Sequence, residues 1–280
     1  MRAPNPITLA ANASDEPEFR DIGLGPWAQT HPGEPRPTDP RYDPALLDDG
    51  DRRNVLDRYR YWTVEAIKAD LDAKGRHDFE VAVENWTHDF NIGSMVRTAN
   101  AFTARRVHIV GPHKWNRKGA LMTELYQHVE HHPSIAALID AWKHRIAGEI
   151  ASAHADASAA AVHAHWAATN GDSQSAALAL ATVNSADQRI KELEAARVIA
   201  LDIIPGAVPM ERYRFPKRCL LLFGAEGPGL SDKALELADD VVYISQFGSV
   251  RSINAGAAAA VAMHAWIAQH AAPAETPYAQ

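Results

Sequence analysis

The chain has 280 residues, of which 46% are hydrophobic and 22% charged, and its formal net charge at pH 7 is −7. This composition is typical of a soluble globular protein with one large domain or one domain with additions, and it argues weakly against nucleic acid as a partner. The N-terminus lacks the apolar core of a signal peptide, and the longest apolar run, residues 255–268, is mostly alanine, so we expect no membrane span and a cytoplasmic location. The single cysteine, Cys219, excludes an internal disulfide and lies in the apolar run CLLLF, which predicts a buried structural thiol in a reducing compartment.

Residues 1–75 are expected to form an N-terminal arm followed by a helix. The first 45 residues or so are rich in Pro, Asp and Gly, which is typical of a poorly ordered or surface-wrapping segment. From Asp51 to Lys74 apolar side chains recur at helical spacing, so we predict an amphipathic helix there that ends at Gly75.

Residues 76–280 are predicted to form an α/β domain. Strands are expected at 79–84, 107–110, 198–203, 220–223 and 241–245, and helices at 91–103, 134–145, 231–238 and 252–270. Two further helical patterns, separated by NGDSQS, predict a helical hairpin inserted at 146–196. The hairpin is open to three interpretations: scaffold, dimer element or RNA contact.

Charge is unevenly distributed along the chain. Residues 85–118 contain six Lys/Arg and one acid, Asp89. Residues 1–80 contain eleven Lys/Arg and sixteen Asp/Glu. A local basic patch on an acidic protein can bind phosphates, although a solvated charged surface gives the same pattern.

Three segments carry the chemistry. They are NWTHDFNIGSMVRTANAF at 85–102, LLLFGAEGPGLS at 220–231 and ISQFGSVRSINAGAAAA at 244–260. The second and third follow predicted strands and are rich in Gly and small polar residues, and loops at strand ends are where α/β proteins hold ligands. The glycines at 224, 227, 229 and 248 allow a ligand to approach the backbone closely.

In this order the segments resemble the three motifs of the SPOUT superfamily, specifically its SpoU or TrmH-like branch of RNA ribose 2′-O-methyltransferases. The resemblance spans residues 80–270 and implies a knotted α/β fold, with a deep C-terminal trefoil knot that holds S-adenosylmethionine. It also implies a homodimer that methylates structured RNA, either tRNA or rRNA. The residues that it implies for catalysis are Asn91, Arg97, Glu226, Ser252 and Asn254. Those that it implies around the cofactor are Phe223, Gly224, Ile244, Gln246, Gly248 and Ile253.

Two of these residues raise a chemical question. A ribose 2′-OH is a poor nucleophile until its proton is lost or shared, and Arg97 is the candidate activator. Because a guanidinium stays protonated in proteins, we expect Arg97 to hold the flanking phosphate and stabilise the developing alkoxide rather than act as a base. Six residues correspond to about 600° of helix rotation, so Asn91 is expected at the N-terminus of the helix and off the Arg97 face.

The chain departs from the family pattern at two places. Thr103 stands where the first motif commonly has a glycine, and Ser245 and Gln246 stand where the third motif often has Pro-Met. Purely structural interpretations also remain for two of these residues. Glu226 could cap a turn, and Ser252 could be only the N-cap of the last helix.

Other functions are less well supported by the residues. The fourteen histidines, among them His128, His131 and His132, lack a cysteine pair or HExxH spacing, so no metal is expected. No Lys follows the glycines of GAEGPGLS in the Walker position, which disfavours a phosphate loop. A catalytically inactive RNA-binding or assembly protein of the same fold remains the alternative function.

Overall fold

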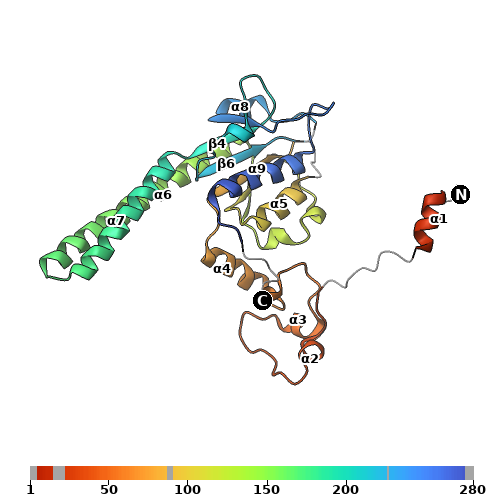
Figure 1. Ribbon diagram of the computed structural model, residues 1–280, viewed down its shortest axis with the longest axis horizontal. Helices are drawn as coiled ribbons and strands as arrows, with labels where there is room; N and C mark the ends of the chain where they lie inside the picture. The colour runs from red at the N-terminus through yellow and green to blue at the C-terminus, as the bar shows by residue number, and fades with distance from the viewer. Residues whose placement is uncertain (1–4, 15–22, 87–90, 226, 275–280) are drawn as a thin grey trace. The chain divides into compact units, whose positions relative to one another are not determined.

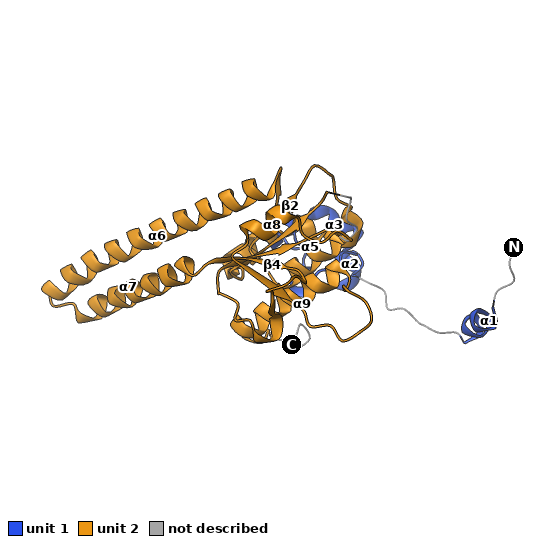
Figure 2. Cartoon of the chain, turned by 90° about the horizontal axis from the view of Figure 1, so that it is seen from above, with its two compact units in different colours: residues 1–67, 276–280 blue, residues 68–275 orange. Residues whose placement is uncertain are grey.

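The computed structural model describes residues 5–14, 23–86, 91–225 and 227–274 (Figure 1). The chain divides into two compact units, residues 1–67 with 276–280 and residues 68–275 (Figure 2). Among the described helices, none combines the length and apolarity that a membrane crossing demands.

The first unit contains α1 (Pro6–Ala13), α2 (Trp27–Thr30), α3 (Pro44–Asp49) and the 3-10 turn η1 (Asp57–Tyr59), and α4 (Val64–Lys74) starts within it. Its core is aromatic: Tyr59 and Tyr61 are buried, and Trp27 packs edge-on against Tyr61 with ring centroids 5.6 Å apart.

The prediction of a helix that begins at Asp51 is wrong for residues 51–63. The buried Asp51 carboxylate accepts hydrogen bonds from the backbone N–H groups of Arg53 and Tyr61 and pairs with the Arg53 guanidinium at 2.7 Å. Tyr61 also has a positive φ of 61°, which a regular helix does not allow. Local hydrogen bonding to a buried acid therefore overrides the helical spacing of the apolar residues.

The second unit is built on a seven-stranded sheet with the order β3-β2-β1-β6-β4-β7-β5. All paired strands are parallel, so their carboxyl ends lie at one edge. The strands are β1 (Phe79–Glu84), β2 (Val107–Val110), β3 (Val129–His132), β4 (Arg197–Leu201), β5 (Val208–Pro209), β6 (Cys219–Phe223) and β7 (Asp240–Tyr243). The predicted α/β class is confirmed, while the knot stays a prediction.

Helices cover both faces of this sheet (Figure 1). One face packs against α5 (Ile92–Ala101) and α9 (Ala255–His270) around Met95, Met263 and Trp266. The other packs against α6 (Ile135–Thr169) and α8 (Asp232–Leu237) around Leu138, Trp142 and Ala234. Cys219 is fully buried, and burial raises the pKa of its thiol, as expected of a structural cysteine.

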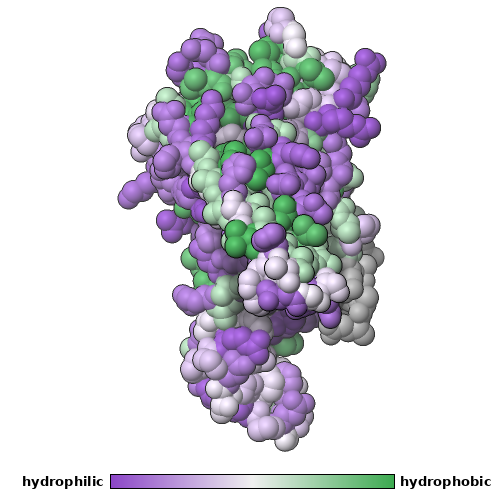
Figure 3. All heavy atoms as spheres, turned by 90° about the vertical axis from the view of Figure 1, so that its left-hand side faces the viewer, coloured by the Kyte–Doolittle hydropathy of each residue, from purple (hydrophilic) through white to green (hydrophobic). Residues whose placement is uncertain are grey.

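The long helices α6 and α7 (Ser173–Glu194) pack against each other and extend away from the sheet (Figures 1 and 2). The helix predicted at 134–145 and the first arm of the hairpin form one continuous helix, because the buried stripe of Trp142, Ile146 and Ala153 continues through the expected break. In Figure 3 hydrophilic residues are interspersed with separate hydrophobic ones over the face of the molecule that is seen.

Strand β1 is buried along its whole length although apolar and polar residues alternate in it. All six of its residues are buried, including Glu80 and Glu84. Burial by itself would raise the pKa of Glu80, but the hydrogen bond from His108 and the charges of Arg218 and His108 lower it to about 2. The polar positions of β1 are therefore buried ion-pair and hydrogen-bond sites.

Candidate functional site

The three motif segments meet the same edge of the sheet because they follow three parallel strands. The first segment continues from β1, the second from β6 and the third from β7, with β4 between β6 and β7. In parallel α/β sheets this carboxyl edge is where ligands bind.

Two of the predicted catalytic residues form a hydrogen bond with each other. Asn254 Nδ2 lies 2.9 Å from Asn91 Oδ1, although the residues are 163 positions apart. Asn91 occupies the N-cap position of α5, as expected, but its side chain makes no capping hydrogen bond to its own helix. The structure therefore brings together the N-termini of α5 and α9.

Gly256 explains how closely the two helix ends approach. A Cβ at this position would lie 2.6 Å from Ser94 Oγ and 3.2 Å from Asn254 Oδ1. Neither Gly256 nor Ser94 was among the predicted site residues. A glycine in the first turn of a predicted helix is the signal that could have indicated this close packing.

Arg97 lies in the interior of α5, and its side chain is exposed. It is six residues from Asn91, about 9 Å along the helix axis. No ion pair joins Arg97 to any carboxylate in the described part of the chain. A purely structural salt bridge would be the alternative explanation for this arginine. None is observed within that part of the chain.

The turn after β6 is held by two carboxylates at the ends of β1 and β4, the two strands that flank β6. Asp202 Oδ2 accepts from Leu230 N at 3.2 Å, and Glu84 accepts from the N–H and hydroxyl of Ser231, each at 2.7 Å. Glu84 also accepts from Trp86 Nε1 at 2.8 Å. These anchoring acids were not predicted, since single acids after apolar strands carry no distinctive spacing.

Gly224 lies where the chain of this turn passes close to itself, and only a glycine allows that close approach. A Cβ on Gly224 would lie 2.0 Å from Gly229 C and 2.3 Å from Leu230 N. Gly229 has φ +75°, and Gly227 has φ +97°, both in the region that favours glycine. Gly224 is thus required by the fold of the turn, and Glu226 lies outside the described residues.

The segment after β7 is more open. Ile244 packs against the core, Ser245 Oγ donates to Glu211 Oε2 at 2.9 Å, and Gln246 is half-buried. Phe247 is 97% exposed, and a Cβ on Gly248 would meet no atom within 4 Å. Of the predicted cofactor residues, Phe223 and Ile244 contribute to the core, whereas Gly248 and the exposed Ile253 leave backbone open.

Ser252 is not the N-cap of the last helix. The cap is Asn254, whose Oδ1 accepts from Ala257 N at 3.2 Å, and α9 begins at Ala255. Ser252 is exposed in the preceding segment.

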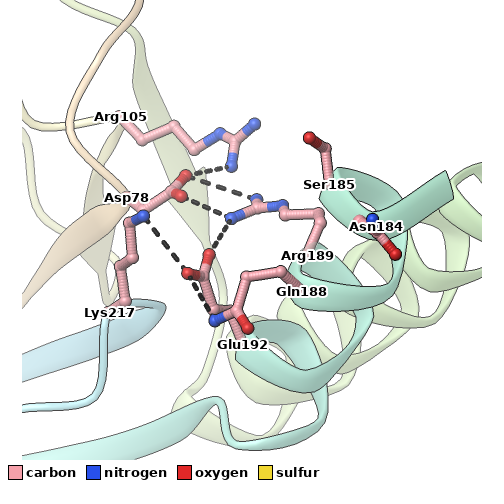
Figure 4. A pocket seen from close by; sticks show the side chains of 8 residues that line it. All are labelled: Asp78, Arg105, Asn184, Ser185, Gln188, Arg189, Glu192 and Lys217. Carbon is pink, nitrogen blue, oxygen red and sulfur yellow. Dashed lines mark hydrogen bonds and ion pairs between the residues drawn. The ribbon is translucent and has the colours of Figure 1, made fainter. Parts of the chain in front are cut away.

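A cavity of about 700 Å³ lies elsewhere, at the amino ends of β1 and β6 (Figure 4). Its basic residues Arg105, Arg189 and Lys217 each pair with Asp78 or Glu192. Because these charges are paired and the motif loops lie at the opposite ends of the strands, this cavity is separate from the candidate site.

The chain was compared with known protein families and curated proteins. Residues 155–264 match the model of the SpoU rRNA methylase family. The match includes the second and third motifs, and the first motif lies outside it. The tRNA (guanosine(18)-2′-O)-methyltransferase of Saccharomyces cerevisiae is 35% identical over 81 residues, which are 29% of this chain and 6% of that protein. The chain thus spans a small fraction of the length of the curated relative that it matches.

Solved structures resemble a large part of this chain. The A. aeolicus TrmH/SpoU tRNA modifying enzyme has a TM-score of 0.50 and 15% identity, covering 74% of this chain and 81% of that one. The SpoU methyltransferase AviRb from Streptomyces viridochromogenes, in complex with AdoMet, has a TM-score of 0.49 and 22% identity, covering 71% and 64%. The likeness to the A. aeolicus protein shows a shared fold.

Proposed function

We propose that the chain is a member of the SpoU methylase family, whose model matches residues 155–264, and that it transfers a methyl group from S-adenosylmethionine to a ribose 2′-OH of structured RNA, either tRNA or rRNA. The observation that carries this proposal is the hydrogen bond between Asn254 and Asn91. It connects the first motif, which the family match does not reach, to the third motif, which lies within it. The two halves of the proposed site therefore belong to one structural unit.

The residues at the carboxyl edge fit the proposed cofactor. Its adenine has hydrogen-bond donor and acceptor edges that backbone groups of turns can recognise, and Gly248 leaves such backbone open. When bound, S-adenosylmethionine supplies an electrophilic methyl group on a sulfonium. Asp202 and Glu84 fix Leu230 and Ser231, at the end of the turn after β6, and a fixed backbone at this edge is what positioning requires.

Arg97 is proposed to stabilise negative charge. A protonated guanidinium donates hydrogen bonds and cannot accept a proton, so Arg97 would hold a flanking phosphate and the oxygen of the 2′-OH while the proton of that hydroxyl passes to solvent water. The N-terminal turns of α5 and α9 point partial positive charge toward the same region. Asn91 and Asn254 position these helix ends, with Ser252 and Glu226 as further proposed members of the site.

The basic segment next to Arg97 is proposed to contact the RNA backbone. Of the six basic residues between 85 and 118, Arg105 and Arg106 are ion-paired with Asp78 and Glu130. Lys114, Arg117 and Lys118 are exposed. The segment that carries them packs against α5, since a Cβ on Gly93 would lie 2.9 Å from Gly119 Cα. These cations therefore adjoin the helix that bears Arg97 and could neutralise phosphates.

The proposal includes a homodimer. Several large apolar side chains are exposed around the candidate site, among them Phe247 at 97% and Val250 at 67%, and a second copy of the chain would cover them.

The direct test is transfer of tritiated methyl groups from S-adenosylmethionine to bulk tRNA and rRNA. Ribose methylation is expected to protect the adjacent phosphodiester from alkaline cleavage, because that cleavage needs the 2′-OH. Label in alkali-resistant dinucleotides would support the proposal. Label confined to alkali-sensitive mononucleotides would indicate base methylation instead, and RNA binding without transfer would favour the inactive RNA-binding alternative.

A further inference from the structure

We propose that His108, Glu130 and His132 form a binding site for a divalent transition-metal ion, with zinc as the ion that they fit. The inference concerns β2 and β3 on the face that α6 covers, and it does not rest on the proposed methyl transfer.

The parallel register of β2 and β3 places the three residues together. His108 pairs with Glu130 and Val110 pairs with His132, so Glu130 and His132 point to the same face as His108. The ligands thus come from two strands, which is why a search for short metal motifs in the sequence does not find them.

The distances between the ligand atoms fit a tetrahedral ion. His108 Nδ1 lies 3.0 Å from His132 Nε2 and 3.5 Å from Glu130 Oε2, and His132 Nε2 lies 3.8 Å from Glu130 Oε2. Zinc bonds of about 2.1 Å in tetrahedral geometry separate the ligand atoms by about 3.4 Å. Small movements of the His132 and Glu130 side chains would bring all three distances to this value.

A buried carboxylate orients the innermost ligand. Glu80 Oε2 lies 2.6 Å from His108 Nε2, and both side chains are completely buried. Because Nε2 is directed at Glu80, Nδ1 is the ring atom of His108 that faces His132 and Glu130. Metal-binding histidines are commonly oriented by a carboxylate in this way.

Exposure increases from His108 outward. The side chains of His132 and Glu130 are 11% and 31% exposed, so water can reach the site and supply a fourth ligand. Two imidazoles and one carboxylate favour a transition metal over magnesium or calcium, which prefer oxygen ligands alone.

Neighbouring arginines limit the affinity of the proposed site for a metal ion. Arg106 donates to Glu130 Oε1 at 2.9 Å, and Arg145 lies 3.3 Å from Glu130 Oε2. Arg218 pairs with Glu80 and Glu149. A metal ion would compete with Arg145 for Oε2 of Glu130, while the Glu80 carboxylate stays next to His108. Its structural effect would be to fix the edge strand β3 to β2 directly before α6 begins.

The test uses the full-length protein, freed of metal by a chelator and titrated with Co²⁺ as a spectroscopic probe. We expect saturable binding of one ion per chain with visible absorption bands of a tetrahedral complex, displaced by Zn²⁺. His132→Ala and Glu130→Gln should each weaken Co²⁺ binding more than about tenfold. His131→Ala is the matched control, since His131 is the adjacent, exposed residue of β3, and it should bind as the wild type does.

Thermal unfolding gives a second readout. Zn²⁺ should raise the Tm of the wild type and of His131→Ala, because an ion that binds the folded state stabilises it, and should not raise the Tm of Glu130→Gln. Mg²⁺ should have no effect. Absence of saturable Co²⁺ binding by folded wild-type protein, or equal binding by both Glu130→Gln and His132→Ala, would overturn the proposal and assign any binding to other histidines.

Discussion

The side-chain amide of Asn254 joins two helices that begin 163 residues apart along the chain. Its Oδ1 caps α9 by accepting from Ala257 N at 3.2 Å, and its Nδ2 donates to Asn91 Oδ1 at 2.9 Å, at the start of α5. One residue therefore stabilises α9 and positions the helix that carries Arg97.

Replacing Asn254 should affect both stability and activity. Asn254→Ala removes the N-cap of α9 and should reduce the free energy of unfolding by about 1 kcal/mol. Ser252→Ala is the matched control, because Ser252 caps no helix, and its unfolding free energy should change by less than about 0.5 kcal/mol. Denaturant unfolding of the two variants checks this, and equal losses of stability would contradict the capping role of Asn254.

The glycines of the two loops should respond differently to an added methyl group. Gly224→Ala should lower the unfolding free energy by at least about 3 kcal/mol, because its Cβ would overlap the backbone at Gly229. Gly248→Ala should leave stability nearly unchanged, since its Cβ has open space. If the cofactor approaches this backbone, the Kd of Gly248→Ala for S-adenosylmethionine should rise about tenfold, a change of about 1.4 kcal/mol that calorimetry detects. An unchanged Kd would remove Gly248 from the cofactor site.

Thr103 is strained at the position where the family motif commonly has glycine. Its φ is 45°, which is unfavourable for a β-branched residue, and its hydroxyl lies 3.1 Å from His77 Nδ1. Thr103→Gly should raise the unfolding free energy by up to about 1 kcal/mol, because relief of strain outweighs one hydrogen bond. Thr103→Ala keeps the strain and loses the hydroxyl, so it should be less stable than the wild type. A less stable Thr103→Gly would show that the contact with His77 dominates.

The first unit should lose stability in acid through Asp51. Burial would raise the pKa of Asp51, but the hydrogen bonds from Arg53 and Tyr61 outweigh it, and the net pKa lies below the ordinary value of 3.8. A carboxyl whose pKa is lower in the folded state stabilises that state above its unfolded pKa and loses this contribution as the pH falls below about 4. Fluorescence of Trp27 and Trp62 can follow this transition. Asp51→Asn should be less stable at pH 7 and should show a shallower dependence between about pH 4 and pH 2; an unchanged acid slope would show that other groups control it.

The parallel core was predictable because its strands are short apolar runs between helices. The predicted ranges 79–84 and 107–110 coincide with β1 and β2, and those of β4, β6 and β7 differ by one or two residues at their ends. Strand β3 was missed because Glu130, His131 and His132 give it no apolar alternation, and β5 because it is two residues long. Both lie at the edges of the sheet, where burial constrains sequence least.

The site was only partly predictable for a related reason. The motif resemblance indicated Asn91 and Asn254, but the hydrogen bond between them depends on the packing of α5 on α9, which a glycine at 256 permits. Buried charge is equally hard to predict: Glu80 and Arg218 are 138 residues apart, and they are tolerable inside the protein because they pair with each other and with His108 and Glu149 respectively.

The role of Arg97 gives the most direct test of the proposed function. We expect Arg97→Ala to lower the rate of tritiated-methyl transfer to RNA by about 10²–10³-fold, the loss expected when one donor to a developing anion is removed. Its affinity for S-adenosylmethionine and its Tm should stay near those of the wild type, because Arg97 is exposed and has no ion pair with a described carboxylate. Lys143→Ala, which removes an exposed charge from α6, is the control and should transfer methyl groups normally. Undiminished transfer by folded Arg97→Ala would contradict the account.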